Sequence, residues 1–237
     1  MKKLFFEKIT STNDYAKEHF SELEDKTIIC ADNQTNGHGR LGRKWVSTND
    51  NGLNLYASLV LKPPKECPYN NFTQYVSVVL CNVLGSYNVK SNIKWPNDVL
   101  VNGLKICGIL AERTSQMNGF VIGIGVNLNL SKEETESMDK PATSLNLLLG
   151  KKIDRDEFSE KFCTEFEKNY DNFLKNGFEY IRDEYLKRTD FLGKEIAVSI
   201  NRDEKIKGIA KDINNDGELV LELSDKKEKI IISGEIN

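Results

Sequence analysis

Two Asn-Gly dipeptides, each next to runs of apolar residues, constrain the fold of this chain more than any other feature. Asn102-Gly103 joins Val99-Leu100-Val101 to an apolar run at 104–111, and Asn118-Gly119 leads into another at 120–130. Both residues of a two-residue hairpin turn need a positive φ, which asparagine and glycine adopt readily. The sequence therefore predicts two β-hairpins, and with them an antiparallel meander at the centre of the protein.

Side-chain periodicity predicts the other elements of the first part of the chain. A β-branched run at 27–31 and an alternating run at 53–61 predict strands, and Pro63-Pro64 ends the second. Four helices are predicted: one after the capping-box sequence 11–14, one at 72–84, one with an aromatic stripe from 158 to 174, and one at 178–188. The charged segment 131–141 has no periodicity and is predicted to be a surface loop.

The texture of the sequence changes near residue 190. After Gly193 come four short alternating runs interrupted by Asn214-Asn215-Asp216-Gly217, a pattern typical of a small β-barrel. A chain of 237 residues is long enough to bury a real core in a larger preceding domain. We therefore expect an α+β fold, with a mixed or antiparallel sheet and helices in residues 1–189 and a small barrel in residues 190–237.

Composition excludes several classes of protein. A formal net charge of −3 argues against sequence-independent nucleic-acid binding, which needs a broad basic surface. The five cysteines are scattered and form no Cys-x-x-Cys pair, as expected of reduced thiols in a cytosol, and the two histidines suggest no resident zinc site. No apolar run approaches the roughly 20 residues of a membrane span, and no signal peptide is apparent. We expect a soluble, cytoplasmic protein.

The segment from Gly37 to Trp45, with the sequence GHGRLGRKW, is the first that suggests chemistry. Its glycines let a ligand approach the backbone closely, and the guanidinium groups of Arg40 and Arg43 suit phosphate oxygens. It lacks the spacing of a Walker phosphate-binding loop. A solvated flexible loop remains the alternative interpretation.

The second such segment is Lys94-Trp95-Pro96-Asn97-Asp98, together with the hairpin strand that follows it. Lys105 is the only charged residue in the run 104–110, whose two faces are both apolar. A buried ammonium needs an anionic partner, which is either a structural carboxylate or a ligand. The residues alone leave these two alternatives open.

Taken together and in order, these motifs resemble those of biotin protein ligases. The resemblance rests on STN at 11–13, Gln34, GHGRLGRKW at 37–45, KWPND at 94–98, GLKICGIL at 103–110 and GIGVN at 123–127. It implies a catalytic domain like that of class II synthetases and an SH3-like C-terminal barrel. It also implies that biotin is activated by ATP, with Mg²⁺, to biotinyl-5′-AMP with release of pyrophosphate. Biotin would then pass to a lysine of a biotin carboxyl carrier domain.

The resemblance assigns roles residue by residue. It implies that biotin contacts a polar and glycine-containing set: Ser11, Thr12, Asn13, Gln34, Gly37, His38, Gly39, Arg40, Lys105 and Gly108. It implies that ATP or the adenylate contacts a second set: Arg40, Arg43, Trp45, Lys94, Asn97, Gly123 and Asn127. Lys105 and Arg40 would stabilise charge during the reaction. Asp98 is the candidate for orienting or deprotonating the acceptor amine, its alternative being a turn carboxylate bonded to nearby N–H groups.

The sequence departs from the family pattern in three places. His38 stands where arginine is common, no basic residue follows Gly234-Glu235-Ile236-Asn237, and STN begins at residue 11. The last departure leads us to expect a monofunctional ligase without an N-terminal DNA-binding domain, and no DNA or membrane partner. A homodimer is compatible with the resemblance. The alternatives are a lipoate protein ligase, which shares the chemistry, and a non-catalytic nucleic-acid-binding module.

Overall fold

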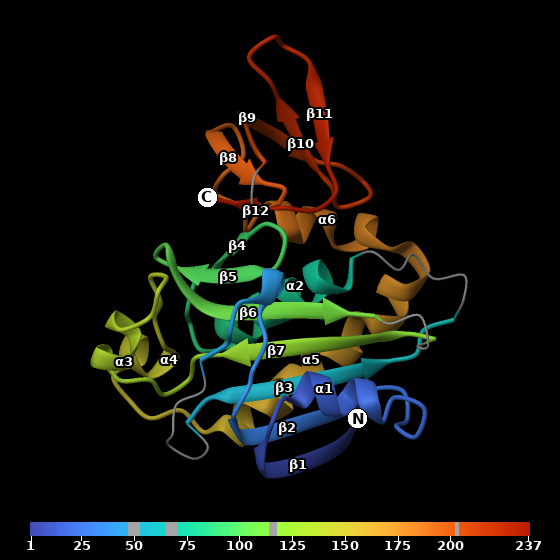
Figure 1. The fold of residues 1–237 in the computed structure, drawn as a ribbon, viewed down its shortest axis with the longest axis vertical. Helices are drawn as coiled ribbons and strands as arrows, with labels where there is room; N and C mark the ends of the chain where they lie inside the picture. Colours follow the sequence, from blue (N-terminus) through green and yellow to red (C-terminus); the bar gives the residue numbers. More distant parts are fainter. Residues whose placement is uncertain (47–52, 65–70, 114–117, 202–203) are drawn as a thin grey trace.

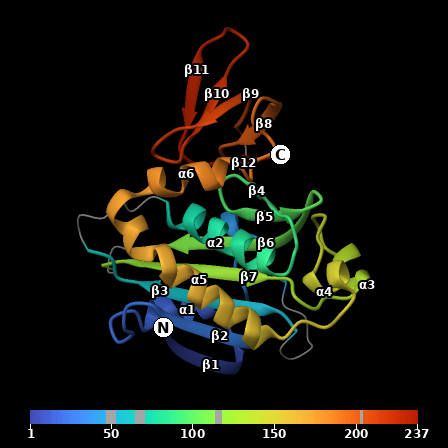
Figure 2. The same cartoon turned by 180° about the vertical axis from the view of Figure 1, so that it is seen from behind.

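The computed structural model describes residues 1–46, 53–64, 71–113, 118–201 and 204–237. Cys67 and part of the segment between the strands predicted at 27–31 and 53–61 lie outside these residues. Within them, the chain forms a seven-stranded sheet with helices on both faces and a second, five-stranded sheet at one end (Figures 1 and 2).

The large sheet is mixed, as the sequence predicts. In spatial order its strands are β1 (Lys2–Ile9), β2 (Thr27–Gln34), β3 (Leu55–Leu61), β7 (Phe120–Val126), β6 (Leu104–Glu112), β5 (Asp98–Val101) and β4 (Asn92–Lys94). Only β1 and β2 pair in parallel; the other neighbours are antiparallel. The central meander is therefore confirmed, but its second connection is longer than the two-residue turn predicted at Asn118-Gly119, since β6 ends at Glu112 and β7 begins at Phe120. At its first turn Asn102 and Gly103 have φ values of 51° and 79°, as a two-residue hairpin requires.

Helices cover the two faces of this sheet unequally. The short helix α1 (Thr12–Glu18) packs on one face, where Ala16 and Phe20 meet Ile29 and Val60. The long helices cover the opposite face: α2 (Phe72–Ser86), α5 (Arg155–Asn176) and α6 (Phe178–Leu186) (Figure 2). The aromatic stripe of α5 is wholly buried, which confirms that its spacing marks core packing. The face with α1 is thus left open for a site.

Two sequence-based expectations for local structure are incomplete or wrong. Strand β1 was not predicted, because only Leu4, Phe6 and Ile9 of this edge strand are partly buried and Phe5 is 53% exposed. The segment 131–141 is not simply a loop, since it contains helix α3 (Lys132–Glu136). A reciprocal capping box between Ser131 and Glu134 stabilises this polar turn in place of apolar periodicity. Helix α4 (Leu145–Leu149) follows it.

The C-terminal sheet is antiparallel throughout. Its order is β11 (Glu228–Ile231), β10 (Leu219–Glu222), β9 (Lys205–Ile213), β8 (Glu195–Ser199) and β12 (Glu235–Ile236). No pairing closes β11 onto β12 within the described ranges, so the expected barrel is an open sheet here. The carbonyl of Gly217 accepts hydrogen bonds from Trp95 Nε1 (3.1 Å) and Gln74 Nε2 (2.9 Å). The buried core continues across this junction, and the division at residues 189 and 190 stays a proposal.

Across the described ranges, none of the helices has the length and apolar content that crossing a membrane requires.

Candidate active site

A cavity of about 540 Å³ lies on the face of the large sheet that carries α1. It is bounded by the start of α1, the glycine-rich segment 38–46, the turn before β5, strands β6 and β7, and the segment 138–142, with Glu235 reaching in from the C-terminal sheet. Figure 1 shows the glycine-rich segment crossing in front of β6 and β7. Segments from the start, the middle and the end of the sequence therefore meet at one place.

The floor of the cavity is bare backbone. Gly108 of β6 and Gly125 of β7 are paired residues, and the indole of Trp45 lies against both. A Cβ at Gly108 would come within 2.7 Å of the indole, and one at Gly125 within 2.4 Å. The indole Nε1 is buried and has no hydrogen-bond partner among the described residues. A buried donor in this state is suited to an acceptor supplied by a ligand.

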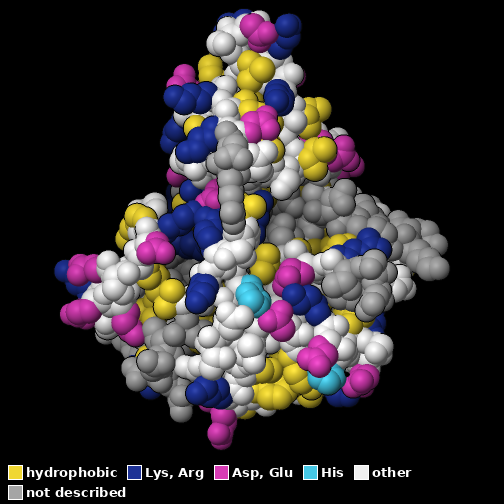
Figure 3. All heavy atoms as spheres, in the orientation of Figure 1, with side chains coloured by type: hydrophobic (Ala, Val, Ile, Leu, Met, Phe, Trp, Pro, Cys, Tyr) yellow, Lys and Arg dark blue, Asp and Glu magenta, His cyan; other side chains and the backbone are white. Residues whose placement is uncertain are grey.

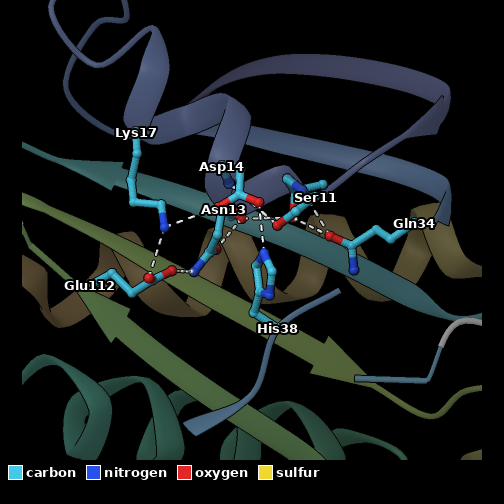
Figure 4. Close-up of polar contacts among 9 residues, drawn as sticks. Ser11, Asn13, Asp14, Lys17, Gln34, His38 and Glu112 are labelled. Atoms are coloured by element: carbon cyan, nitrogen blue, oxygen red, sulfur yellow. Dashed lines mark hydrogen bonds and ion pairs between the residues drawn. The ribbon is translucent and has the colours of Figure 1, made fainter. Parts of the chain in front are cut away.

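One end of the cavity is lined by neutral hydrogen-bonding groups, shown in Figure 4. Gln34 Oε1 accepts from the Thr12 N–H (2.8 Å) and from Thr12 Oγ1 (3.0 Å), which leaves the amide N–H donors of Gln34 for another partner. Ser11 caps α1 by accepting from the Asp14 N–H at 3.3 Å and also lines the cavity. The helix-cap interpretation of Ser11 and its place in the site therefore hold together.

Lys105 of β6 lines the cavity and has a carboxylate partner. Its Nζ is 2.7 Å from Asp98 Oδ1, and the two side chains are 26% and 15% exposed. The same Nζ lies 5.5 Å from the centroid of the Trp45 ring. Of the two partners that the sequence left open, the structural carboxylate is present. Because both groups line the cavity, a ligand can contact the same ammonium.

Two asparagine side chains near Lys105 form hydrogen bonds that fix Arg40 and one wall of the cavity. Asn97 accepts from Arg40 Nη1 at 2.9 Å and donates to the Ile109 carbonyl at 2.7 Å. Asn127 Nδ2 donates to the Thr143 carbonyl at 3.0 Å, and the Thr143 N–H donates to the Lys105 carbonyl at 2.9 Å. The segment before α4 is therefore fixed against β6 and forms a wall of the cavity.

The other end of the cavity is cationic. The guanidinium of Arg43 donates two hydrogen bonds to Glu235, at 2.9 and 2.6 Å, and Lys140 pairs with the same carboxylate. Burial acts to raise the pKa of Glu235, but the hydrogen bonds from Arg43 and Lys140 outweigh it and hold the pKa at about 2. Burial lowers the pKa of Arg40, and burial followed by repulsion from Lys140 lowers that of Lys94. Crowded, partly desolvated cations of this kind favour binding of a polyanion.

More basic than acidic side chains line the cavity. The basic ones are Arg40, Arg43, Lys44, Lys105 and Lys140, and the acidic ones are Asp98, Asp139 and Glu235. Figure 3 shows Lys and Arg side chains gathered in the hollow between the C-terminal sheet and the body of the protein.

All but two of the residues assigned from sequence line this cavity. Gly37 lies just behind the wall, where its carbonyl accepts from the Trp45 N–H at 3.0 Å, and half-buried Lys94 stands outside the lining. The sequence missed Asp139, Lys140 and Glu235, which line the cationic end. No local motif marks them, since they reach the cavity only through the tertiary fold.

We expect Glu235 to stabilise the fold in a pH-dependent way. Its folded-state pKa of about 2 lies below the ordinary 4.5, so its contribution is complete above 4.5 and is lost as the pH falls toward 2. Denaturant unfolding of the unsubstituted chain and of Glu235→Gln should therefore differ most at pH 7 and progressively less at pH 4 and 3. An equal difference in unfolding free energy at every pH would contradict the expectation.

Comparison with known families decides the identity of this fold. A model described as "Biotin/lipoate A/B protein ligase family" matches residues 5–129, which include α1, the glycine-rich segment and strands β3 to β7. The chain belongs to this ligase family. A second model, described as "Biotin protein ligase C terminal domain", matches residues 191–237 of the ligase and places it with the biotin protein ligases.

Individual relatives agree with this assignment. The ligase is 31% identical to the "Bifunctional ligase/repressor BirA" of Bacillus spizizenii, over 94% of this chain and 70% of that one. It is 31% identical to the "Biotin--[acetyl-CoA-carboxylase] ligase" of Paracoccus denitrificans, over 89% of this chain and 90% of the relative. A solved biotin protein ligase of Aquifex aeolicus, in complex with biotin and ATP, superposes with a TM-score of 0.84 at 29% identity, covering 100% of this chain and 97% of that one.

Proposed function

We propose that this ligase activates biotin with ATP to biotinyl-5′-AMP and then transfers biotin to a lysine of a biotin carboxyl carrier domain. The observation that carries the proposal is the division of the cavity into two ends, with Lys105 between them. The end at Ser11, Thr12 and Gln34 offers neutral donors and acceptors, and the end at Arg43 and Lys140 offers cations. A molecule with a ureido ring and a carboxylate tail suits the first end, and a nucleoside triphosphate suits the second.

Biotin would lie with its ring at the neutral end and its carboxylate toward Lys105. The ureido carbonyl accepts and its N–H groups donate, which matches the mixed hydrogen-bonding groups of Ser11, Thr12, Asn13 and Gln34. The backbone of Gly37, His38 and Gly39 would border this end, and Gly108 would form the floor under it. We propose that His38 borders the neutral end, although arginine is common at this position in the family.

In the first step a carboxylate oxygen of biotin attacks the α-phosphorus of ATP, the new P–O bond forms, and pyrophosphate leaves. A carboxyl group with a pKa of about 4 to 5 is already ionised at neutral pH, so the step needs no general base. Lys105 and Arg40 would stabilise the charge that builds up between carboxylate and phosphate, and Mg²⁺ would arrive bound to ATP. Arg43 and Lys140 would contact the departing pyrophosphate. Lys94, which does not line the cavity, would add to the positive potential at this end.

Most of the side chains that the resemblance assigns to the nucleotide already have partners within the protein. Asn97 and Asn127 already bond Arg40 and the neighbouring carbonyls, so we propose that they place the groups that contact the nucleotide. Gly123, which the resemblance assigns to the nucleotide, lies beside Asn13 of the neutral end, since a Cβ there would come within 2.5 Å of Asn13 Oδ1. Trp45 supplies an aromatic face and a buried donor.

In the second step the acceptor lysine loses a proton to solvent, and its neutral amine attacks the carbonyl carbon of the adenylate. The C–N bond forms, the bond from that carbon to the phosphate oxygen breaks, AMP leaves, and the second amine proton passes to solvent to give the amide. Asp98 is the proposed residue for orienting this amine. Asp98 Oδ1 lies 2.7 Å from Lys105 Nζ, so its carboxyl oxygens are held at the cavity, where they can accept a hydrogen bond from the amine.

Thermal shift with biotin, lipoate and DNA, each with and without ATP, tests the proposal at low cost. Biotin at about 100 times its Kd should stabilise the chain by about 2.7 kcal/mol, and ATP should add to this. Stabilisation by lipoate and not by biotin would favour a lipoate ligase, and stabilisation by DNA alone would favour a binding module. Incubation with biotin, ATP and purified carrier domains then tests the transfer itself.

We expect Lys140→Ala to weaken ATP binding selectively. Lys140 is half exposed, so the loss of its charge should raise KM for ATP by only about threefold and leave KM for biotin unchanged. ATP–pyrophosphate exchange measures both constants, and Lys151→Ala, which removes an exposed lysine away from this cavity, is the matched control. An equal rise in both KM values would place Lys140 outside the nucleotide end.

A further inference from the structure

The glycine-rich segment is folded as a small closed loop whose two ends meet different parts of the protein. The Trp45 N–H donates to the Gly37 carbonyl at 3.0 Å, and the Gly39 N–H donates to the Arg43 carbonyl at 2.7 Å. At the tip, Arg43 bonds Glu235 of the C-terminal sheet. At the base, His38 turns toward α1. The loop thus bridges the cavity from its neutral end to its cationic end.

The contact at the base is a hydrogen bond between His38 and Asp14. His38 Nε2 lies 2.7 Å from Asp14 Oδ2, and Lys17 Nζ lies 3.0 Å from the other oxygen of the same carboxylate. Burial acts to raise the pKa of Asp14, but its hydrogen bonds to His38 and Lys17 lower it overall. A carboxylate only accepts hydrogen bonds, so Nε2 of His38 carries the proton and the orientation of the ring is fixed.

A second set of contacts fixes Asp14 itself. Lys17 bridges Asp14 to Glu112 of β6, with its Nζ at 2.8 Å from Glu112 Oε1. Glu112 Oε2 in turn accepts from Asn13 Nδ2 at 2.6 Å, and Asn13 lines the cavity. Figure 4 shows these side chains converging from α1, β6 and the loop. Asp14 is therefore tied to both α1 and the large sheet, while it does not itself line the cavity.

We infer that Asp14 is a positioning residue that, acting through His38, holds the glycine-rich loop over the neutral end of the cavity. This inference rests on the proposed function, in which that end receives biotin. The contact is separate from the one between Arg43 and Glu235, because the two carboxylates hold opposite ends of the loop. The contacts therefore act on different substrates. Loss of the Asp14 contact raises KM for biotin, and loss of the Glu235 contact raises KM for ATP.

A double-mutant cycle tests the inference by ATP–pyrophosphate exchange. Asp14→Ala and His38→Ala should each raise KM for biotin about fivefold, the effect of one lost hydrogen bond, with KM for ATP nearly unchanged. The double variant should be no worse than either single variant, since both remove the same contact. His38→Gln keeps an N–H donor and should recover most of the loss. Glu235→Gln should show the opposite split between the two KM values.

The control is His19→Gln, which alters the other histidine of the chain. His19 closes α1, its ring faces Glu22 at 3.3 Å, and it is not among the residues that line the cavity, so both KM values should stay unchanged. Melting temperatures identify loss of folding, and if Asp14→Ala is unstable, His38→Ala and His38→Gln still decide the question from the loop side. Additive effects in the double variant, or equal rises in both KM values, would overturn the inference. Absence of biotin-dependent exchange in the unsubstituted chain would instead overturn the proposed function.

Discussion

Lys105→Ala should fold and lose synthesis of the adenylate. The substitution removes the cation that lies between the two ends of the cavity, where biotin carboxylate and α-phosphate would meet. Loss of one preorganised charge at a developing anion lowers the rate by on the order of 100- to 1000-fold. Biotin-dependent ATP–pyrophosphate exchange measures this step without a carrier protein. Exchange at the unsubstituted rate would contradict the role assigned to Lys105.

The main difficulty with this variant is its effect on Asp98. Without Lys105, a carboxylate that is 15% exposed loses its partner, and an unpaired charge in such a place is destabilising. The control is the double variant Lys105→Met with Asp98→Asn, in which neither charge is present. If the loss of exchange follows from chemistry, the double variant should match the unsubstituted chain in melting temperature and remain inactive. Recovery of exchange in the double variant would mean that the single variant fails through misfolding.

Arg40→Gly should let the adenylate escape. Arg40 lines the cavity from the glycine-rich loop, and its contact with Asn97 at 2.9 Å ties the tip of the loop to the turn before β5. Closure of such a loop keeps water away from a reactive anhydride and retains it. The variant should still bind biotin, but labelling of a bystander protein should rise roughly tenfold, the scale of one charge-assisted hydrogen bond.

Two measurements check this prediction. Biotin attached to serum albumin added to the reaction reports the escaping adenylate. Hydrogen exchange of the described loop residues, 36–46, should slow when biotin and ATP are both present, because ligand contacts add to the hydrogen bonds that already close the loop. We expect residues 36–47 to act as a lid over the adenylate; of these, Ser47 lies outside the described residues. If protection is equal with and without ligands, or if the variant makes adenylate yet never labels a bystander, Arg40 has a binding role only.

Local sequence signals were sufficient to predict an element where one physical cause determines its structure. Asn102-Gly103 defines its own turn, and the aromatic spacing of α5 leaves one buried face. Prediction failed where an element depends on partners elsewhere. Strand β1 exists through its pairing with β2. Helix α3 is a different case, because its capping box, Ser131 with Glu134, is a local signal within a charged run that lacks apolar periodicity.

The candidate site divides in the same way. Motif residues such as Thr12, Gln34 and Lys105 come together as the resemblance implies. Glu235 and Asp14 do not belong to the motifs, and their roles follow from contacts across the chain. Glu235 meets Arg43 across a separation of 192 residues, and Asp14 meets His38 across 24. Sequence spacing carries no information about such pairs, because the fold alone brings them together.

The paired glycines under Trp45 have a consequence for which analogues this site can accept. A wall made of side chains can yield by changing rotamer or by substitution, but Gly108 and Gly125 present main chain that is fixed by its pairing across β6 and β7. A ligand enlarged on the side facing the sheet is therefore rejected by groups that no substitution can shrink. Room over this part of the sheet can be made by replacing Trp45, whose indole lies directly against both glycines, with a smaller residue. Redesign toward larger substrates can therefore begin at that indole.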